Sequence, residues 1–280
     1  MKSARLAAIA VLAAAPLAAW SCSSGPAEPP PAPESAALVV EEEAPPPGAA
    51  EEDATVEPIL RAMSEALRNA KSLSFRVEAW SDESDDDGVC ASVGSESKVL
   101  LRRPDRLMVD RVSEKGHRVA RYDGTSFTLC DSDRGVHATV PARATIDETL
   151  DMLHDDYGVV VPLADLFVGD PYAAYTTVAE KALNLGVRPV RGVACHQIAL
   201  STDWLAWQLW IPVEGPPLPR RIEIRYLDEP GSPRYVANLD EWQVDPPAAD
   251  EAFVFVPPEG SEAIEIRRRE ADEPAAAEAR

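Results

Sequence analysis

Residues 204–244 read WLAWQLWIPVEGPPLPRRIEIRYLDEPGSPRYVANLDEWQV, and this stretch decides the fold. It contains three strand-like runs separated by two turn segments. The middle run alternates between one solvated side and one buried side, the period of a half-buried strand: Arg221, Glu223 and Arg225 against Ile222, Ile224 and Tyr226. The first run, 204–211, is apolar on both sides apart from Gln208, so each side needs a cover. We predict an open, strongly curved antiparallel sheet whose concave face is covered by helices or by a ligand.

The chain before this stretch predicts one helix followed by a meander. Apolar residues at helical spacing predict an amphipathic helix over 58–70, and a strand follows at 72–80. Short strands then alternate with turns at intervals of about 8 to 12 residues. The expected strands are 97–101, 106–112, 118–122, 126–130 and 136–140. Asp123-Gly124 is the strongest hairpin signal in the chain.

A helical insert interrupts the strands. Thr145 and Glu148 have the spacing of a capping box, which predicts a helix from residue 146. Shorter helices are expected at 162–167 and 171–175, and the apolar insert must lie on the open face of the sheet. Strands resume at 178–186 and 193–200. We expect the last strand at 253–256, with a further short edge at 264–266.

The composition is strongly acidic. The chain has 27 Lys and Arg against 48 Asp and Glu, a net charge of −21. Residues 54–266 alone hold 36 acidic and 21 basic side chains, so the acidity belongs to the folded part as well. Such a field repels nucleic acid and anionic lipid surfaces, and we expect no nucleic-acid partner.

The two ends of the chain do not belong to the fold. Residues 1–21 have the charged start and short apolar run of a secretory signal. Residues 22–54 are rich in Pro, Ala and Glu and form a disordered, extended tether. The domain is expected to cover 55–266, and 267–280 to be a disordered charged tail.

Cys22 offers two interpretations of the export signal. It follows the apolar run directly and precedes SSGPAEPPPAPE, which favours a lipid-modified N-terminus facing the periplasm of a bacterial cell envelope. Trp20 fits a lipid-attachment motif poorly, and cleavage after Ala19 would give a soluble periplasmic protein instead. In the first case, the N-terminal lipid would be the only contact with the membrane.

Three further cysteines, Cys90, Cys130 and Cys195, permit one disulfide in an exported chain, and the sequence does not choose the pair. Cys195 and His196 are adjacent on an expected strand, so their side chains face opposite sides and do not converge on a site.

No pattern of residues indicates catalysis. Glu83, Asp85, Asp87 and Gly88 match the first positions of a calcium loop, but the twelfth position is Gly94, which favours an exposed hairpin tip. The four histidines are widely spaced and lack a partner motif for zinc. There is no GxSxG elbow and no glycine-rich phosphate loop. We expect a protein that is not an enzyme, with no cofactor and no metal.

Several segments together resemble a known group of proteins. These are RPDRLMVDRV (103–112), YDGTSFTLCDSDRGVHATVPA (122–142), IDETLDMLHDDYGVVVPLADLF (146–167), WQLWI (207–211), PLPRRIEIRY (217–226) and FVFVPPEG (253–260). They resemble a family of predicted periplasmic proteins that forms a domain of unknown function. That family is similar in fold to lipoprotein carriers of the LolA/LolB type and to mycobacterial lipid-binding lipoproteins. The resemblance implies an α+β fold: a half-open β-barrel with helices covering the concave face, able to bind an acyl chain there.

From this we predict a protein that binds a lipid or other amphiphile in its concave cavity. The alternative is a non-enzymatic interaction module whose cavity is filled by its own helices and which binds another envelope protein. The candidate cavity residues are Trp80, Leu107, Val109, Leu153, Leu163, Leu166, Phe167, Trp204, Trp207, Trp210, Ile222, Ile224 and Tyr226.

Overall fold

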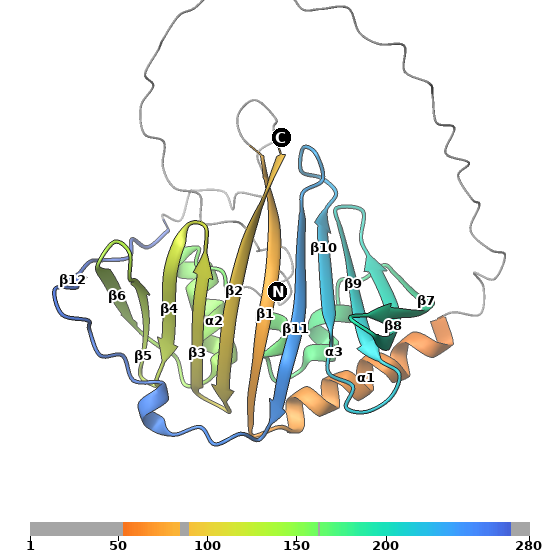
Figure 1. Ribbon diagram of the computed structural model, residues 1–280, viewed down its shortest axis with the longest axis horizontal. Coiled ribbons are helices and arrows are strands. Elements are labelled where there is room, and N and C mark those ends of the chain that lie inside the picture. The colour runs from red at the N-terminus through yellow and green to blue at the C-terminus, as the bar shows by residue number, and fades with distance from the viewer. Residues whose placement is uncertain (1–52, 85–89, 162, 270–280) are drawn as a thin grey trace, which may run out of the picture.

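The computed structural model describes residues 53–84, 90–161 and 163–269 and shows one twelve-stranded open sheet with helices on one face (Figure 1). All neighbouring strands are antiparallel except β12 and β6, which are parallel. The order across the sheet is β12-β6-β5-β4-β3-β2-β1-β11-β10-β9-β8-β7. The predicted curved, half-open antiparallel sheet is therefore confirmed.

The elements have the following bounds. The strands are β1 (Ser72–Ser84), β2 (Cys90–Arg102), β3 (Arg106–Ser113), β4 (Gly116–Tyr122), β5 (Ser126–Asp131), β6 (Val136–Pro141), β7 (Lys181–Val190), β8 (Val193–Ser201), β9 (Leu205–Pro212), β10 (Arg221–Tyr226), β11 (Arg234–Val244) and β12 (Glu262–Ala263). The helices are α1 (Asp53–Asn69), α2 (Ile146–Tyr157), α3 (Pro171–Thr176) and two 3₁₀ turns, η1 (Ala164–Leu166) and η2 (Asp250–Ala252).

Two meanders make up the sheet. β1 to β6 form the first, β7 to β11 form the second, and β11 returns to pair with β1. Because α2, η1 and α3 lie between the meanders in sequence, they cross the sheet on one side, as Figure 1 shows. We call the face that carries these helices the concave face and the opposite face the convex face.

The core lies between the concave face and the helices. The β10 alternation is as predicted, with Ile222, Ile224 and Tyr226 buried and Arg225 exposed. In α2, Ile146, Leu150 and Leu153 are buried against this face in one continuous cluster. α1 adds Val56, Leu60, Met63 and Leu67, and contacts α3 and β7. Burial of these side chains is the main force that holds the helices on the sheet.

The predicted cap of α2 is confirmed. The Thr145 hydroxyl accepts a hydrogen bond from the Glu148 amide at 3.2 Å, and Gly158 ends the helix with φ 64°. The next predicted helix, 162–167, is only the 3₁₀ turn η1. Leu163 begins this turn with a left-handed backbone, which interrupts a regular helix.

The C-terminal strand prediction is wrong. Residues 253–256 form no strand, because the chain turns through η2 and buries Phe253 completely beside Arg102. It then rises along the left-hand edge of the molecule in Figure 1 to the outer strand β6. There β12 pairs with β6, two residues before the short edge expected at 264–266. Ser261 adds a hydrogen bond to His137 at 2.7 Å.

The sequence also predicted β1 and β2 too short. Their pairing continues from Ser72 opposite Arg102 to Ser84 opposite Cys90, so the first half of the acidic segment belongs to a strand. Several predictions lie outside the described residues: the signal 1–21, Cys22, the tether as far as residue 52, the calcium-loop positions Asp85, Asp87 and Gly88, Pro162, and 270–280 of the tail.

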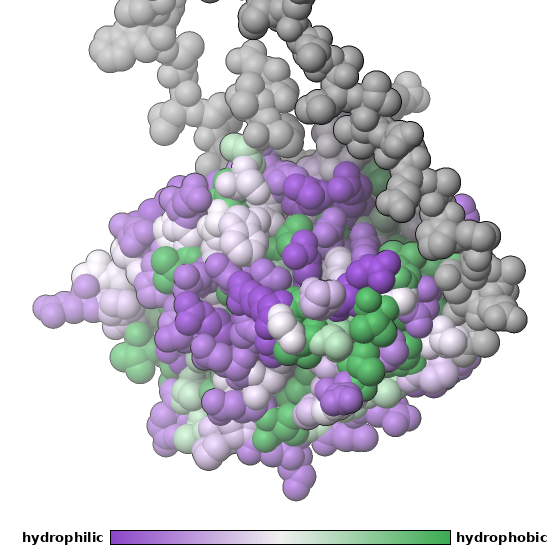
Figure 2. Space-filling model, turned by 45° about the vertical axis from the view of Figure 1, so that its right-hand side comes forward, coloured by the Kyte–Doolittle hydropathy of each residue, from purple (hydrophilic) through white to green (hydrophobic). Residues whose placement is uncertain are grey.

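β7 forms the free edge at the other end of the sheet. Figure 2 brings this side forward and shows hydrophobic residues in green among hydrophilic residues in purple. β7 contributes exposed Leu183, Leu185 and Val187. A register shift between Asn184 and Val187, together with Pro189, interrupts the edge and discourages pairing with another strand.

A β-bulge in β11 shapes the centre of the core. Ser74 pairs with Gln243 and Arg76 with Asp240, so two residues, Glu241 and Trp242, lie opposite Phe75 alone. Glu241 adopts φ 55°, and the extra residue turns Trp242 onto the concave side. There the Trp242 ring stacks on Phe75 with ring centroids 4.2 Å apart, and its indole N–H donates to the Pro219 carbonyl at 3.0 Å.

We predict that Glu241→Gly raises the free energy of unfolding by about 1 kcal/mol, because glycine adopts the left-handed conformation without a Cβ clash. Urea unfolding measures this change. Glu96→Gly is the matched control: both glutamates pair with Arg76, but Glu96 lies in a regular strand where glycine costs stability. Equal losses of stability in both variants would contradict the assignment of strain to Glu241.

Candidate functional site

The concave face is not completely filled. A cavity of about 130 Å³ lies between the first meander and residues 159–161. Its apolar wall is formed by Val109, Ala120, Phe127, Leu129 and Tyr235 on the sheet, with the three valines 159–161 opposite. This wall chemistry suits a hydrocarbon chain.

A second, smaller cavity of about 30 Å³ lies on the other side of the same three valines. Its lining includes Leu163, Tyr175, Ile222 and Ile224. Residues 159–161, which we call the strap, are thus a wall shared by the two cavities. The linings of the two cavities together include residues from β3 to β10, and the strap is the part that they share.

The strap is held at its ends. At the α2 end, the Val159 amide donates to the Leu153 carbonyl at 2.9 Å, next to Gly158 in the left-handed conformation. At the other end, the Ala164 amide donates to the Val161 carbonyl at 3.2 Å, beside Leu163 with φ 61°. A left-handed leucine costs roughly 1 kcal/mol or more, so this end of the strap is under local strain.

Basic side chains form one end of the larger cavity. Arg111 on β3, Lys115 in the β3–β4 turn and Arg118 on β4 all line it. Lys115 pairs with Glu83 at 2.6 Å, and Arg118 pairs with Asp131 on β5 at 3.2 Å. On the cavity side of β3, the lining therefore changes from apolar Val109 to basic Arg111 over two residues. The cavity is amphipathic.

Tyr235 closes the cavity from β11. Burial raises the pKa of its hydroxyl to about 12, although nearby Arg111 acts in the opposite direction. The hydroxyl is therefore neutral at physiological pH, and the cations of this end face a neutral phenol rather than a phenolate.

Arg103 joins the segment after the strap to the rest of the fold. Its guanidinium donates to the Phe167 carbonyl at 2.7 Å and to the Leu67 carbonyl at 3.3 Å. It thus connects the β2–β3 turn, the end of η1 and the end of α1. Burial lowers the pKa of Arg103, and the neighbouring carboxylate of Asp147 partly offsets this shift.

The structure places most of the predicted cavity residues on the concave side. Val109 lines the larger cavity, while Leu163, Ile222 and Ile224 line the smaller one. The others are buried in, or packed against, the surrounding core: Leu107, Leu153, Leu166, Phe167, Trp204, Trp207 and Tyr226.

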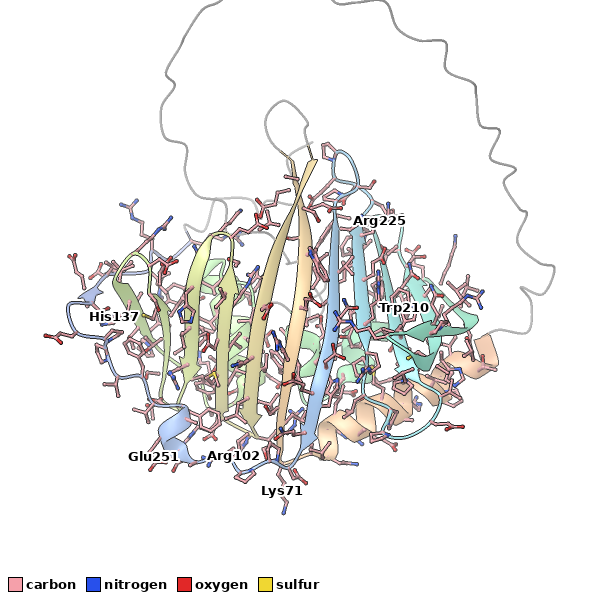
Figure 3. The ribbon with its side chains drawn as sticks, in the orientation of Figure 1. Lys71, Arg102, His137, Trp210, Arg225 and Glu251 are labelled. Carbon is pink, nitrogen blue, oxygen red and sulfur yellow. The ribbon has the colours of Figure 1, made fainter. Side chains whose placement is uncertain are left out.

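Trp80 and Trp210 lie on the opposite, convex face. Strand alternation puts Trp80 out of phase with buried Val77 and Ala79, and it covers Gly94, its cross-strand partner, while remaining 36% exposed. Trp210 packs with Val190, Val193 and Cys195, and the Arg221 guanidinium lies 5.1 Å from the centre of its ring. Figure 3 labels Trp210 on this part of the sheet. Both tryptophans were included among the predicted cavity residues because neither had been assigned to a face of its strand.

Sequence reasoning missed the polar end of the cavity and the strap. One signal was present: Leu107, Val109 and Arg111 share one face of β3, so an arginine ends an apolar stripe. The role of the valines in dividing the cavity depends on how the helical insert lies on the sheet, which no local pattern reveals.

A broad groove of about 660 Å³ crosses the other side of β1 to β4. Its lining combines charged residues such as Arg76, Glu78 and Asp110 with exposed Trp80 and Val112. His117 reaches Asp110 across this surface at 2.8 Å. The groove is wider and more polar than the concave cavity.

Within residues 53–84, 90–161 and 163–269, no group of three or more His, Cys, Asp and Glu side chains could hold a metal ion. Cys130 and Cys195 are both buried and free, so no disulfide joins them. Among the helices in these ranges, none has the length and apolar character needed to cross a membrane.

A family model described as "Predicted periplasmic protein (DUF2092)" matches residues 56–267. No curated protein matches this chain. The matched range begins within α1 and ends after β12, so it includes both meanders, the helices between them and both cavities.

Several solved structures are similar. One is an uncharacterised conserved protein from Thermus thermophilus, with 10% identity, 75% of this chain and 98% of that chain covered, and a TM-score of 0.45. LprF from Mycobacterium bovis shares 12% identity over 76% of this chain and all of its own, with a TM-score of 0.42. The LolA superfamily protein NE2245 from Nitrosomonas europaea shares 12% identity over 71% of this chain and 97% of its own, with a TM-score of 0.39.

We predict that Arg103→Met lowers the free energy of unfolding by roughly 2 kcal/mol, because two partly buried carbonyl groups lose a charged donor. Backbone hydrogen exchange in residues 159–168 should accelerate more than exchange in β9. Arg143→Met, at an exposed position before α2, is the control and should change neither quantity. Unchanged exchange at 159–168 in the Arg103 variant would show that Arg103 does not hold this segment.

Proposed function

Since this chain belongs to the family of predicted periplasmic proteins described as DUF2092, we propose that it is a non-enzymatic cell-envelope protein that binds a lipid or other amphiphile on its concave face. The observation that supports this proposal is the pair of cavities with apolar walls that share the strap, residues 159–161, in their linings. A chain lying across both would contact the two meanders together.

The two cavities are too small for a complete long-chain ligand. The larger measures about 130 Å³ and the smaller about 30 Å³, whereas sites for drug-sized ligands occupy about 300 to 1,000 Å³. Binding therefore requires the strap, with the neighbouring part of 146–167, to move off the sheet. The bonds at the two ends of the strap and the left-handed Leu163 identify where the backbone would turn.

Hydrocarbon burial supplies enough free energy for such a movement. Each buried CH₂ group contributes about 0.8 kcal/mol, so a chain of about 12 carbons contributes roughly 9 kcal/mol before other costs. Association and ordering cost about 4 kcal/mol or more, to which displacement of the strap is added. The expected affinity is therefore modest, which suits a protein that takes up and releases its ligand.

We further propose that Cys22 carries a lipid and that 22–54 is the tether between this anchor and the domain. The position of Cys22 directly after the apolar run supports this assignment. A soluble periplasmic protein, cleaved after Ala19, is the alternative.

We predict that the full-length chain fractionates with bacterial membranes and that Cys22→Ser moves it to the soluble periplasmic fraction, because the variant has no thiol to acylate. Incorporation of labelled palmitate into the wild-type chain, and not into the variant, checks the modification directly. Equal solubility of the two chains would favour cleavage after Ala19.

One observation favours a second function. The groove of about 660 Å³ on the far side of β1 to β4 carries exposed Trp80 and Val112 beside several charges. An interaction module for another envelope protein would use this surface, with the concave side serving only as core. Binding of an amphiphile on the concave side would favour the first function, and its absence would favour this alternative.

We predict that Ala120→Phe abolishes binding of a single-chain amphiphile, because Ala120 lines the larger cavity and the added ring fills it. Dodecanol is a suitable probe, with binding measured by calorimetry on residues 53–280 purified without detergent. Ala206→Phe is the matched control: Ala206 lies next to buried Trp207 on β9 and so faces the convex side.

Loss of binding in the Ala120 variant alone, with unfolding temperatures like that of the wild type, supports the concave cavity. The failure of dodecanol, dodecanoate and phospholipid to bind the wild-type protein would contradict the proposal and favour the interaction module.

A further inference from the structure

Two arginines face one another on the concave side of the sheet. Arg111 on β3 is paired in register with Arg118 on β4, and both line the larger cavity. Like charges placed directly opposite on neighbouring strands destabilise a sheet unless an anion lies between or beside them. Arg118 has such an anion in Asp131, its neighbour on β5.

Arg111 has no such partner in the part of the chain that the structure describes. It is half-buried, and among these residues it forms no hydrogen bond and no ion pair within 4.0 Å. Two further carboxylates near the β3–β4 turn bind other groups. Glu114 accepts a hydrogen bond from the Gly94 amide at 3.3 Å, and Asp133 accepts one from the His117 amide at 3.1 Å.

The charges at this end of the cavity do not balance. Arg111, Lys115 and Arg118 line it as cations, while Glu83 and Asp131 are the carboxylates paired with the last two. One positive charge remains, in a chain whose net charge is −21. This unpaired charge lines the cavity, and at short range it attracts an anion although the protein as a whole is acidic.

We propose that this end of the cavity binds the anionic head group of a single-chain amphiphile, with Arg111 donating to it and the chain lying along Val109, Ala120 and Leu129. This inference rests on the proposed function and adds the class of ligand. A guanidinium presents a planar set of donors that matches a carboxylate or a phosphate oxygen pair.

The lining of the cavity offers a continuous path for a chain that extends from the basic end. The basic end and the apolar wall are continuous, since Arg111 follows Val109 and Arg118 precedes Ala120 on the same face of their strands. The strap belongs to the apolar lining of both cavities, so a longer chain that displaces it would enter the second cavity beside Ile222 and Ile224.

The test compares four probes that share a twelve-carbon chain and differ in the head group: dodecanoate, dodecyl phosphate, dodecanol and dodecyltrimethylammonium. Calorimetry is carried out below the micellar concentration at low and moderate ionic strength. Both anions should bind roughly tenfold or more tightly than dodecanol, the size expected for a charged hydrogen bond. The difference should shrink as salt screens the charges. The ratio of the affinities for dodecanoate and dodecyl phosphate distinguishes a carboxylate head group from a phosphate head group.

Arg111→Met should reduce the affinity for both anions to that for dodecanol and leave dodecanol binding unchanged. Its unfolding temperature should stay the same or rise, because the substitution removes an unpaired charge opposite Arg118. A purely structural arginine would instead lower stability and affect all probes alike. Arg225→Met, on the exposed side of β10 (Figure 3), is the control and should alter no affinity.

Equal affinities for dodecanoate and dodecanol, or tightest binding of the cation, would overturn this inference while leaving amphiphile binding intact. The absence of binding by any of the four probes would overturn the proposed function itself, and this inference with it.

Discussion

The pairing of β1 with β11 is the constraint on which the architecture depends. It joins residues from the two ends of the domain, with Val77 opposite Leu239 and Ala79 opposite Ala237. Without it, the two meanders would be separate sheets, each with an exposed apolar face. With it, their buried faces become one surface, and a single set of helices can cover both. The bulge at Glu241 shifts the register of the β1–β11 pairing, so that the Trp242 ring stacks on Phe75.

The position of the cavity follows from the same arrangement. α1 and α3 are bound to the β7 side of the sheet and to each other, through contacts such as Arg61 over the ring of Tyr172 at 4.1 Å. α2 and the strap are left to cover the wide first meander. Three valines cannot fill the space over Val109, Ala120 and Leu129, so a cavity remains there. The helices thus form most of the core, and the strap covers the part that a ligand could occupy.

Much of the fold could be predicted because its signals are local. The alternation in 221–226, the turn at Asp123-Gly124 and the Thr145 cap each act over a few residues, and each is present in the structure. The errors arise where distant contacts decide. Phe253 has the pattern of a strand residue, but it directly follows the 3₁₀ turn η2 and is buried beside Arg102. Trp210 is apolar like the cavity residues, but neighbouring residues of a strand face opposite sides of the sheet, and Trp210 faces the convex side. The opposition of Arg111 and Arg118 depends on the length of the β3–β4 turn, since one residue more or less would give each a different partner.

A concave surface filled by its own helices is compatible with ligand binding because the two parts of that surface differ in what holds them. The α2 side chains Ile146, Leu150 and Leu153 are almost completely buried, and their removal from the sheet would cost several kcal/mol. The strap residues are only half-buried and border empty space on both sides, so their displacement loses less contact. A hydrocarbon chain that replaces them restores the lost burial and fills space that the closed protein leaves empty. In the proposed complex, the unpaired charge of Arg111 would give the chain a direction: its head group would stay at the β3–β4 turn, and its tail would be the part that moves the strap.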